Sequence, residues 1–214
     1  VVVSVKQNKK GHDEDSPGIV GLVPHIIRGH SRVFATAGVA VLLLTVLRAG
    51  RQLLIPLWGV SLGLDPSDIG LIMGAAAAVD MCMFPLAGYM MDNWGRKYAA
   101  VSCLVLLSLG LTVMPWSDSF ITLAAAAMLA GPGNGLGSGI NMTLGADFAP
   151  PRERGEFLGV WRLMGDVGSF TGPVFMGYIA NAFMLASAFT VTASFGFIGA
   201  AIMLFLVKET LQKR

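Results

Sequence analysis

The sequence is poor in charge. Only 13% of its 214 residues are Asp, Glu, Lys or Arg, whereas 54% are hydrophobic. Soluble domains of ordinary composition carry about 25% charged residues. Charged side chains are also missing from long stretches of the chain and gather in short segments between apolar runs. This distribution argues against an ordinary soluble domain and is typical of a protein that crosses a membrane several times.

Cysteine and histidine are also scarce. Cys82 and Cys103 both lie inside apolar runs, so we interpret them as small apolar side chains and not as a disulfide. The three histidines all lie within residues 12–30, and no metal-ligand spacing occurs. A nucleophile–base set and a cofactor motif are likewise missing, and the glycine-rich run at 131–139 lacks the strand and the Lys-Ser/Thr ending of a nucleotide loop. We therefore predict a protein that is not an enzyme and binds no metal, no cofactor and no nucleic acid.

Six apolar segments dominate what is present. Each reaches about the 20 residues with which an α-helix crosses about 30 Å of hydrocarbon, the third only just. Turn-forming residues separate the segments. The predicted helices are a (33–62), b (67–91), c (98–116), d (119–147), e (155–181) and f (183–207).

Basic residues are absent from every second loop. The a–b, c–d and e–f loops contain no lysine or arginine and carry only Asp65, Asp68 and Asp118. Twelve of the fifteen basic residues lie before helix a, after helix f, or in the b–c and d–e loops. Because lysine and arginine are retained on the cytoplasmic side of a membrane, we expect both ends of this chain to be cytoplasmic in a multi-pass protein of the cell membrane.

Three regions follow from this pattern: a cytoplasmic tail (1–32), a six-helix transmembrane bundle (33–207) and a short cytoplasmic tail (208–214). Within the first tail, residues 17–28 mix apolar residues with glycine and proline. They are either an amphipathic segment on the membrane surface or an unstructured linker. The chain begins with Val1 and shows no signal-peptide pattern. We expect a fragment or trimmed product whose first residues belong to a central loop.

The b–c junction contains a motif formed by Gly88, Asp92, Gly95, Arg96 and Lys97. It resembles the loop motif of the major facilitator superfamily in every element except Asn93, where that family usually has a basic residue. Glycine permits close helix packing at position 88 and a tight turn at position 95.

Asp147, at the end of helix d, is expected on the same face of the membrane as this motif. We therefore predict a cytoplasmic charge cluster of Asp92, Arg96 and Asp147, which braces the outward-facing state implied by the resemblance and breaks as the two halves rock.

A second resemblance lies on helix e. Gly159, Gly168, Gly172, Pro173 and Gly177 are similar to a glycine–proline pattern that marks the fifth helix of many antiporters in the family, with Met176 as a departure. The pattern is either an antiporter signature or generic packing of small residues, since glycine lets two helices approach and proline permits a bend.

The resemblance implies half of a twelve-helix fold, built as two inverted three-helix repeats. Helix d lacks the arginine that the family's first half usually carries on its fourth helix, which favours the C-terminal half. The partners implied are the lipid bilayer, the missing N-terminal half, a small-molecule substrate and protons. Helix d also reads Pro132-Gly133-Asn134-Gly135, which predicts a flexible or broken helix there.

Five ionisable residues fall inside the predicted spans: Arg48, Arg51, Asp80, Arg162 and Asp166. Each is a candidate functional residue, because a charge in the bilayer is costly unless it is paired or hydrated. At about 1.5 Å per residue, Arg48, Asp80 and Asp166 share a level near the midplane. We predict an Arg48–Asp80 interaction, either as a neutralising pair or at a substrate or proton site. Arg162 and Asp166 are interpreted as a structural pair at i,i+4 spacing.

The leading hypothesis is secondary active transport of a small organic solute by alternating access, with proton-coupled efflux favoured by the helix e pattern. Uptake of a sugar or metabolite by the same fold is the alternative within this class. A non-transporting six-helix scaffold is the alternative outside it.

Overall fold

The structure is a computed structural model that describes residues 19–137 and 139–211, and the secondary structure of this part is helical throughout. The helices are α1 (Ile19–Gly29), α2 (Ser31–Val33), η1 (Phe34–Gly38), α3 (Val39–Ser61), α4 (Pro66–Cys82), α5 (Phe84–Asn93), α6 (Arg96–Val113), η2 (Met114–Trp116), α7 (Phe120–Leu136), α8 (Ile140–Phe148), α9 (Arg154–Ala182) and α10 (Leu185–Leu206).

Five helical segments of the described chain are long and apolar enough to cross a membrane: Ser31–Ser61, Pro66–Asn93, Arg96–Trp116, Phe120–Phe148 and Leu185–Leu206. They coincide with predicted helices a, b, c, d and f, so this is a multi-pass membrane protein. Helix α9 is long enough, at 29 residues, but is not among the five because glycine, serine, threonine and four charged residues dilute its apolar residues. A sixth span, and the inverted repeat of two three-helix units, stay predictions.

Two of the spans are interrupted. The second breaks at Met83, between α4 and α5, where Pro85 stands in the first turn of α5. The fourth breaks between α7 and α8, where Gly139 has a left-handed φ of 81°. The predicted break at Pro132–Gly135 is therefore wrong by about one turn, since Pro132 and Asn134 both lie inside α7.

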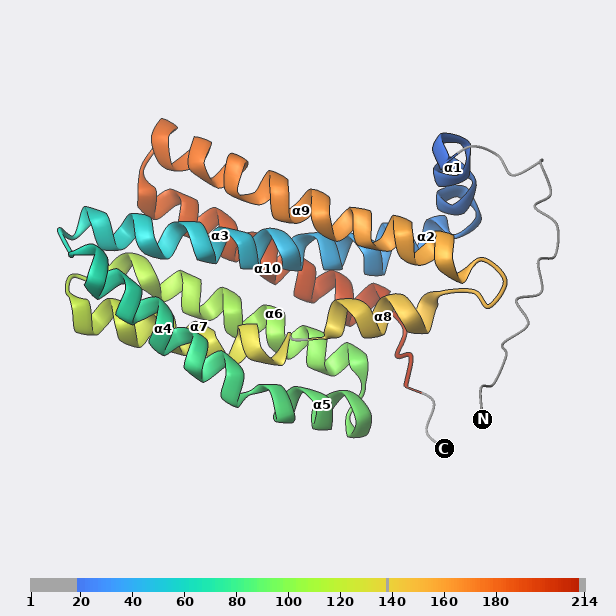
Figure 1. The fold of residues 1–214 in the computed structure, drawn as a ribbon, viewed down its shortest axis with the longest axis horizontal. Helices are drawn as coiled ribbons and strands as arrows, with labels where there is room; N and C mark the ends of the chain where they lie inside the picture. The colour runs from blue at the N-terminus through green and yellow to red at the C-terminus, as the bar shows by residue number, and fades with distance from the viewer. Residues whose placement is uncertain (1–18, 138, 212–214) are drawn as a thin grey trace, which may run out of the picture.

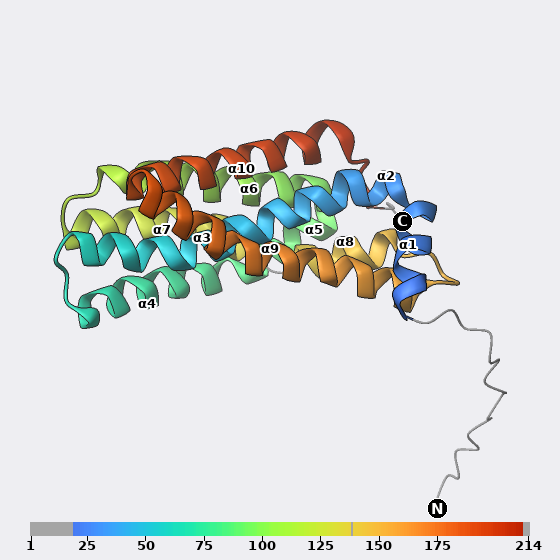
Figure 2. The ribbon, with the colours of Figure 1, turned by 90° about the horizontal axis from the view of Figure 1, so that it is seen from above.

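Helices α3, α4 and α9 lie on one side of the bundle, and α6 and α10 lie on the other (Figures 1 and 2). The α3–α4, α6–α7 and α9–α10 connections meet at one end. The α5–α6 and α8–α9 connections meet at the opposite end with α1, α2 and the last described residues (Figure 1). The basic loops thus share one end of the bundle, as the alternation of charge predicted.

Helix α7 is packed tightly on both of its sides. A Cβ added at Gly133 would collide with the backbone nitrogen of Leu107 in α6, and one at Gly135 would collide with the carbonyl oxygen of Asp80 in α4. These glycines therefore let the backbones of three helices approach closely. The close approach brings Asn134, which lies between them in sequence, to the same depth as Asp80.

Helix α9 packs along α3 through part of the predicted glycine pattern. A Cβ at Gly168 would collide with the Thr45 hydroxyl, and one at Gly172 would lie 3.1 Å from the backbone of Val46. Gly159 and Gly177 have no neighbour within 4 Å of such a Cβ. Two of the four glycines thus serve packing within the described chain and two do not.

Helix α1 crosses the end of the bundle beside α9 (Figure 1). Ile26 is buried against the bundle, whereas His25 and Arg28 are exposed. Of the two interpretations of residues 17–28, the structure favours an amphipathic helix. Residues 1–18 of the predicted tail lie outside the described residues.

Candidate functional site

An ion pair lies inside the bundle between α3 and α4. Arg51 donates from Nη1 to Oδ2 of Asp80 at 3.0 Å, and both side chains are nearly inaccessible, at 6% and 12% exposed. The same guanidinium reaches the carbonyl oxygen of Ala127 in α7 at 3.5 Å. The aspartate partner predicted from the sequence was Arg48, so that pairing is wrong: Arg51, one turn further along α3, is the direct partner.

Arg48 reaches Asp80 through a third residue that was not considered as a site residue. Its Nε donates to Oδ1 of Asn134 at 2.8 Å, and its Nη2 donates to the Asn134 carbonyl oxygen at 2.7 Å. The Asn134 amide in turn donates to Oδ2 of Asp80 at 2.6 Å. The prediction that Arg48 and Asp80 face one interior surface is confirmed, with Asn134 as the bridge.

We call Arg48, Arg51, Asp80 and Asn134 the membrane-level network. It contains two guanidinium groups and one carboxylate, so it carries a formal charge of +1. Two of its buried polar atoms, Arg51 Nε and Asp80 Oδ1, have no hydrogen-bond partner within residues 19–137 and 139–211. Buried polar groups are normally satisfied, and an uncompensated charge in the membrane is a marker of a functional site.

An open cavity of about 470 Å³ lies between α3 and α9, next to this network. Arg48 and Gln52 line it from α3, and Ser169 and Pro173 line it from α9, with Thr45, Ala49 and Leu53 completing the wall. Arg48 therefore joins the buried network to a space that a solute or a partner surface can reach. Pro173, singled out for helix e, belongs to this wall.

The exposed side of α9 has two different surfaces. Arg162 and Asp166 lie 3.8 Å apart at i,i+4 spacing, with side chains 77% and 70% exposed. They share a helical stripe with Gly159, Ser169 and Pro173, whereas the neighbouring stripe is apolar and exposed and contains Leu163, Val167, Phe170, Val174 and Tyr178. The predicted Arg162–Asp166 pair is present, but it neutralises an exposed surface and does not join two helices of the described chain.

The loop motif forms a second network at the basic end of the bundle. Arg96 donates from Nε to Oδ2 of Asp147 at 3.1 Å and from Nη1 to the carbonyl oxygen of Met91 at 2.9 Å. The predicted contact between Arg96 and Asp147 is confirmed. Asp92 is exposed and forms no ion pair with any other described residue, so its predicted place in the cluster is not supported.

A segment that follows α10 completes this network and was missed. The two carboxylate oxygens of Glu209 accept hydrogen bonds from the backbone N–H groups of Arg96 and Lys97, at 3.0 and 3.2 Å. The Thr210 hydroxyl donates to Oδ2 of Asp147 at 2.8 Å. Glu209 therefore caps the N-terminus of α6, where unpaired N–H groups attract an anion. The sequence feature that could have indicated this contact is the Glu209–Thr210 pair directly after the last apolar segment.

Two glycines of the loop motif have different surroundings. Gly95 has φ 118°, and a Cβ built on it would collide with the Glu209 carboxylate, so glycine is required both for the turn and for the cap. Gly88 has no neighbour within 4 Å of such a Cβ. The expectation that Gly88 serves close packing is therefore not met by any described residue. We call Arg96, Asp147, Glu209 and Thr210 the end network.

Comparison with known proteins supports the resemblance that these residues suggested. A family model described as Major Facilitator Superfamily matches residues 33–214. The chain belongs to this superfamily of membrane transporters.

Among curated members, it is 30% identical over 126 residues to the MFS-type efflux transporter ffsH of Aspergillus flavipes, covering 58% of this chain and 22% of that protein. It is 26% identical over 127 residues to the quinolone resistance protein NorA of Staphylococcus aureus, covering 59% of this chain and 33% of NorA.

Solved transporters share the fold. A crystal structure of the peptide transporter POT in complex with alafosfalin aligns with a TM-score of 0.64 at 18% identity, over 88% of this chain and 42% of that one. The human organic anion transporter MFSD10 aligns with a TM-score of 0.60 at 18% identity, over 92% of this chain and 49% of that one. The chain therefore spans under half the length of these transporters, and less of the curated relatives that it matches.

Proposed function

We propose that this chain is the C-terminal six-helix half of a secondary transporter of the cell membrane, with both of its ends in the cytoplasm. It exports a small organic solute by alternating access, coupled to protons. The observation that carries the proposal is the membrane-level network, which places a buried carboxylate and a surplus positive charge beside an open cavity. Export is the favoured direction because several similar proteins are named efflux transporters.

Several glycines have open space around them, which supports the proposal that a second, N-terminal half packs on this chain. Gly70 and Gly74 on α4, Gly88 on α5, and Gly159 and Gly177 on α9 have no neighbour within 4 Å of an added Cβ. Helices α4 and α9 flank α3 on the side of the bundle that bears Arg48 (Figure 2). Small residues allow a second bundle to approach closely, so we assign this side to the N-terminal half. The polar stripe of α9 then contacts that half and not lipid, so α9 can be the sixth span.

Each charged residue then has a role in transport. Arg48 faces the cavity and pairs with an anionic group, supplied by the solute or by the other half. Asp80 is the proton-binding group, and Arg51 holds it in place. Arg162 and Asp166 lie against the other half, and the end network braces the cytoplasmic side of one state. Uptake of a sugar or metabolite uses the same residues, and the direction of transport distinguishes it.

Proteoliposomes that contain the full-length transporter test the coupling. A fluorescent quinolone and a panel of dyes are suitable probes, since one relative is a quinolone resistance protein. Asp80→Asn is expected to abolish accumulation driven by a pH gradient while leaving exchange at equal pH intact. Full gradient-driven transport by this variant would refute the role of Asp80. If both the variant and the parent insert normally into the membrane but neither transports any probe, the result would favour the alternative of a non-transporting six-helix scaffold.

Thiol labelling tests the topology separately. Cysteines introduced at Asp65 and Asp118 are expected to react with a membrane-impermeant reagent added outside intact cells, whereas those at Asn93 and Glu153 are expected to react only after permeabilisation. A background lacking Cys82, which is exposed, is required. The reverse pattern would overturn the orientation and with it the cytoplasmic placement of the end network.

A further inference from the structure

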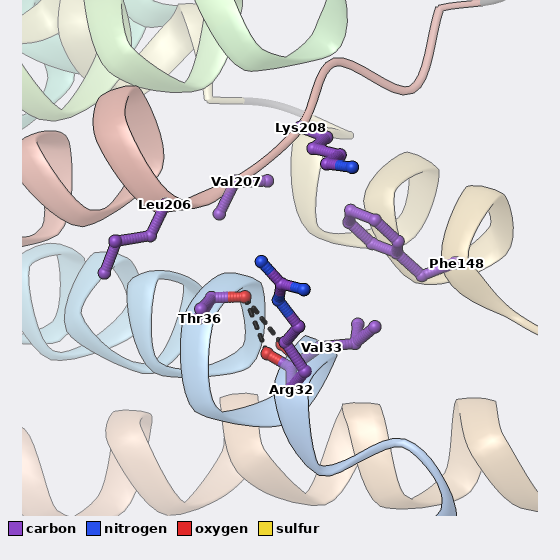
Figure 3. A pocket seen from close by; sticks show the side chains of 7 residues that line it. All are labelled: Arg32, Val33, Thr36, Phe148, Leu206, Val207 and Lys208. Atoms are coloured by element: carbon purple, nitrogen blue, oxygen red, sulfur yellow. Dashed lines mark hydrogen bonds between the residues drawn. The ribbon is translucent and has the colours of Figure 1, made fainter.

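A cavity at the basic end of the bundle belongs to neither network. It has a volume of about 230 Å³ and lies where three segments meet: the start of the first span, the end of α8 and the end of α10. Its lining consists of Arg32, Val33, Thr36, Phe148, Leu206, Val207 and Lys208 (Figure 3).

The lining divides into an apolar wall and two cations. Phe148 points toward the gap from α8, and Leu206 and Val207 line it at the end of α10 (Figure 3). The Arg32 guanidinium extends into the gap, with Lys208 at its far edge (Figure 3). The Thr36 hydroxyl is held locally, since it donates to the Arg32 carbonyl oxygen at 2.8 Å. The cavity therefore presents two positive charges over a hydrocarbon surface.

The nearby carboxylates are committed elsewhere. Both oxygens of Glu209, next to Lys208 in sequence, accept the backbone N–H groups at the start of α6. Asp147, next to Phe148, is bound by Arg96 and Thr210. Arg32 and Lys208 form no ion pair with any residue among 19–137 and 139–211. Two cations that line one cavity and have no anionic partner in the described part of the chain attract a negatively charged ligand.

The position of the cavity indicates which kind of anion binds there. It adjoins the exposed end of α10, where Phe205 and Leu206 are 78% and 58% exposed, so its apolar wall continues onto a surface for lipid chains. The amphipathic helix α1 crosses the same end of the bundle (Figure 1). Basic pockets between spanning helices at the cytoplasmic boundary bind the head groups of anionic lipids.

We propose that this cavity binds an anionic phospholipid of the leaflet at the basic end of the bundle. Arg32 and Lys208 pair with its phosphate, and its acyl chains lie along Leu206 and Phe205. A soluble phosphate would gain the two charges but would leave the apolar wall exposed to water. The site holds together the first and last spans of the chain, and it does not depend on the transported solute or on the direction of transport.

Native mass spectrometry of the purified full-length protein tests this inference. Dioleoyl phosphatidylglycerol and dioleoyl phosphatidylcholine are titrated in parallel, and the parent is expected to retain the anionic lipid preferentially. At about 1 kcal/mol for each basic residue at a membrane surface, Arg32→Gln with Lys208→Gln is expected to weaken phosphatidylglycerol binding by about thirtyfold and leave phosphatidylcholine binding unchanged.

Two matched variants make the result specific. Arg152→Gln with Arg154→Gln removes one basic residue from the α8–α9 loop and one from the start of α9, both outside the cavity, and is expected to retain binding. Arg32→Lys with Lys208→Arg keeps both charges and is expected to retain it too, which separates loss of charge from loss of folding. Equal loss in the Arg152/Arg154 variant, or unchanged binding in the Arg32/Lys208 glutamine variant, would overturn the proposal.

Competition distinguishes a lipid from a free anion. Inorganic phosphate and glycerol phosphate in large excess are expected to displace little phosphatidylglycerol, because neither covers the apolar wall. Full displacement by either would show a simple anion site and overturn the assignment to lipid.

Discussion

The membrane-level network and the end network both join an arginine to an aspartate at about 3 Å, but their surroundings differ. Arg51 and Asp80 are almost completely buried, whereas Arg96 and Asp147 are 19% and 26% exposed. In the end network, backbone N–H groups and a threonine hydroxyl complete the contacts of the carboxylates. In the membrane-level network, Arg51 Nε and Asp80 Oδ1 lack any partner among the described residues.

The comparison shows that equal distances do not imply equal roles. A charge pair near water gains little free energy and is weakened by salt. A buried pair gains more Coulomb energy but costs desolvation, and removing one partner leaves an uncompensated charge. The membrane-level network is therefore sensitive to any change of charge, as the proposed coupling role requires. The end network can form and break at low cost, as the proposed brace between two states requires.

The largest effect is expected from Asp80→Leu, which leaves Arg51 buried without its anion. We expect a loss of about 3 to 5 kcal/mol in the free energy of unfolding, measured by SDS titration in mixed micelles. The double change Arg51→Met with Asp80→Leu should recover most of it, because it removes both charges. A small loss for the single variant would mean that water or the other half already solvates Arg51.

A smaller loss is expected from Asn134→Ala, which disconnects Arg48 from Asp80. The change removes two hydrogen bonds to charged groups, but Arg48 keeps its bond to the Asn134 carbonyl oxygen and Asp80 keeps Arg51. We therefore expect a total loss of about 1.5 to 3 kcal/mol in the same titration, the contribution of a single such bond. Asn141→Ala removes a half-buried amide that accepts a hydrogen bond from Trp161 instead, and it provides a comparison outside the network. In a transport assay, Asn134→Ala should impair turnover and Asn141→Ala should not.

The cap on α6 should contribute less. Glu209→Ala is expected to cost about 0.5 to 2 kcal/mol, the usual range for loss of a helix cap. Gly95→Ala should cost at least as much, because it both strains the turn and displaces Glu209. The double variant should cost less than the sum of the two, since each removes the same cap. Strict additivity of the measured values would show that Gly95 and Glu209 act independently.

The smallest effect, and the one most sensitive to salt, is expected from Asp147→Asn. A partly exposed ion pair contributes about 0.2 to 1 kcal/mol, and raising the ionic strength should reduce the difference between this variant and the parent. The loss from Asp80→Leu should change little with salt, because that pair is shielded from ions. Equal salt dependence of the two variants would remove the distinction between the networks.

Sequence alone predicted the ends of the helices better than the direction in which each side chain points. Apolar runs and charged loops predicted five of the spans to within a few residues. Helices b and d were expected to end on the same face of the membrane, and this predicted the contact between Arg96 and Asp147. The choice of Arg51 over Arg48 depends on the rotation of α3 and on Asn134 from α7, and neither follows from periodicity along one helix. Glu209 was missed because its partners are the backbone N–H groups of two residues that lie 113 and 112 positions earlier, which no local pattern indicates.

That separation has a consequence for how the protein is made. The N-terminal turn of α6 emerges from the ribosome long before the side chain that caps it, so its first N–H groups must bind water or lipid head groups while three further helical segments are synthesised. The α5–α6 turn therefore acquires its final hydrogen bonds only after α10 has been inserted. Nascent chains arrested before residue 209 should show faster amide exchange at Arg96 and Lys97 than released ones.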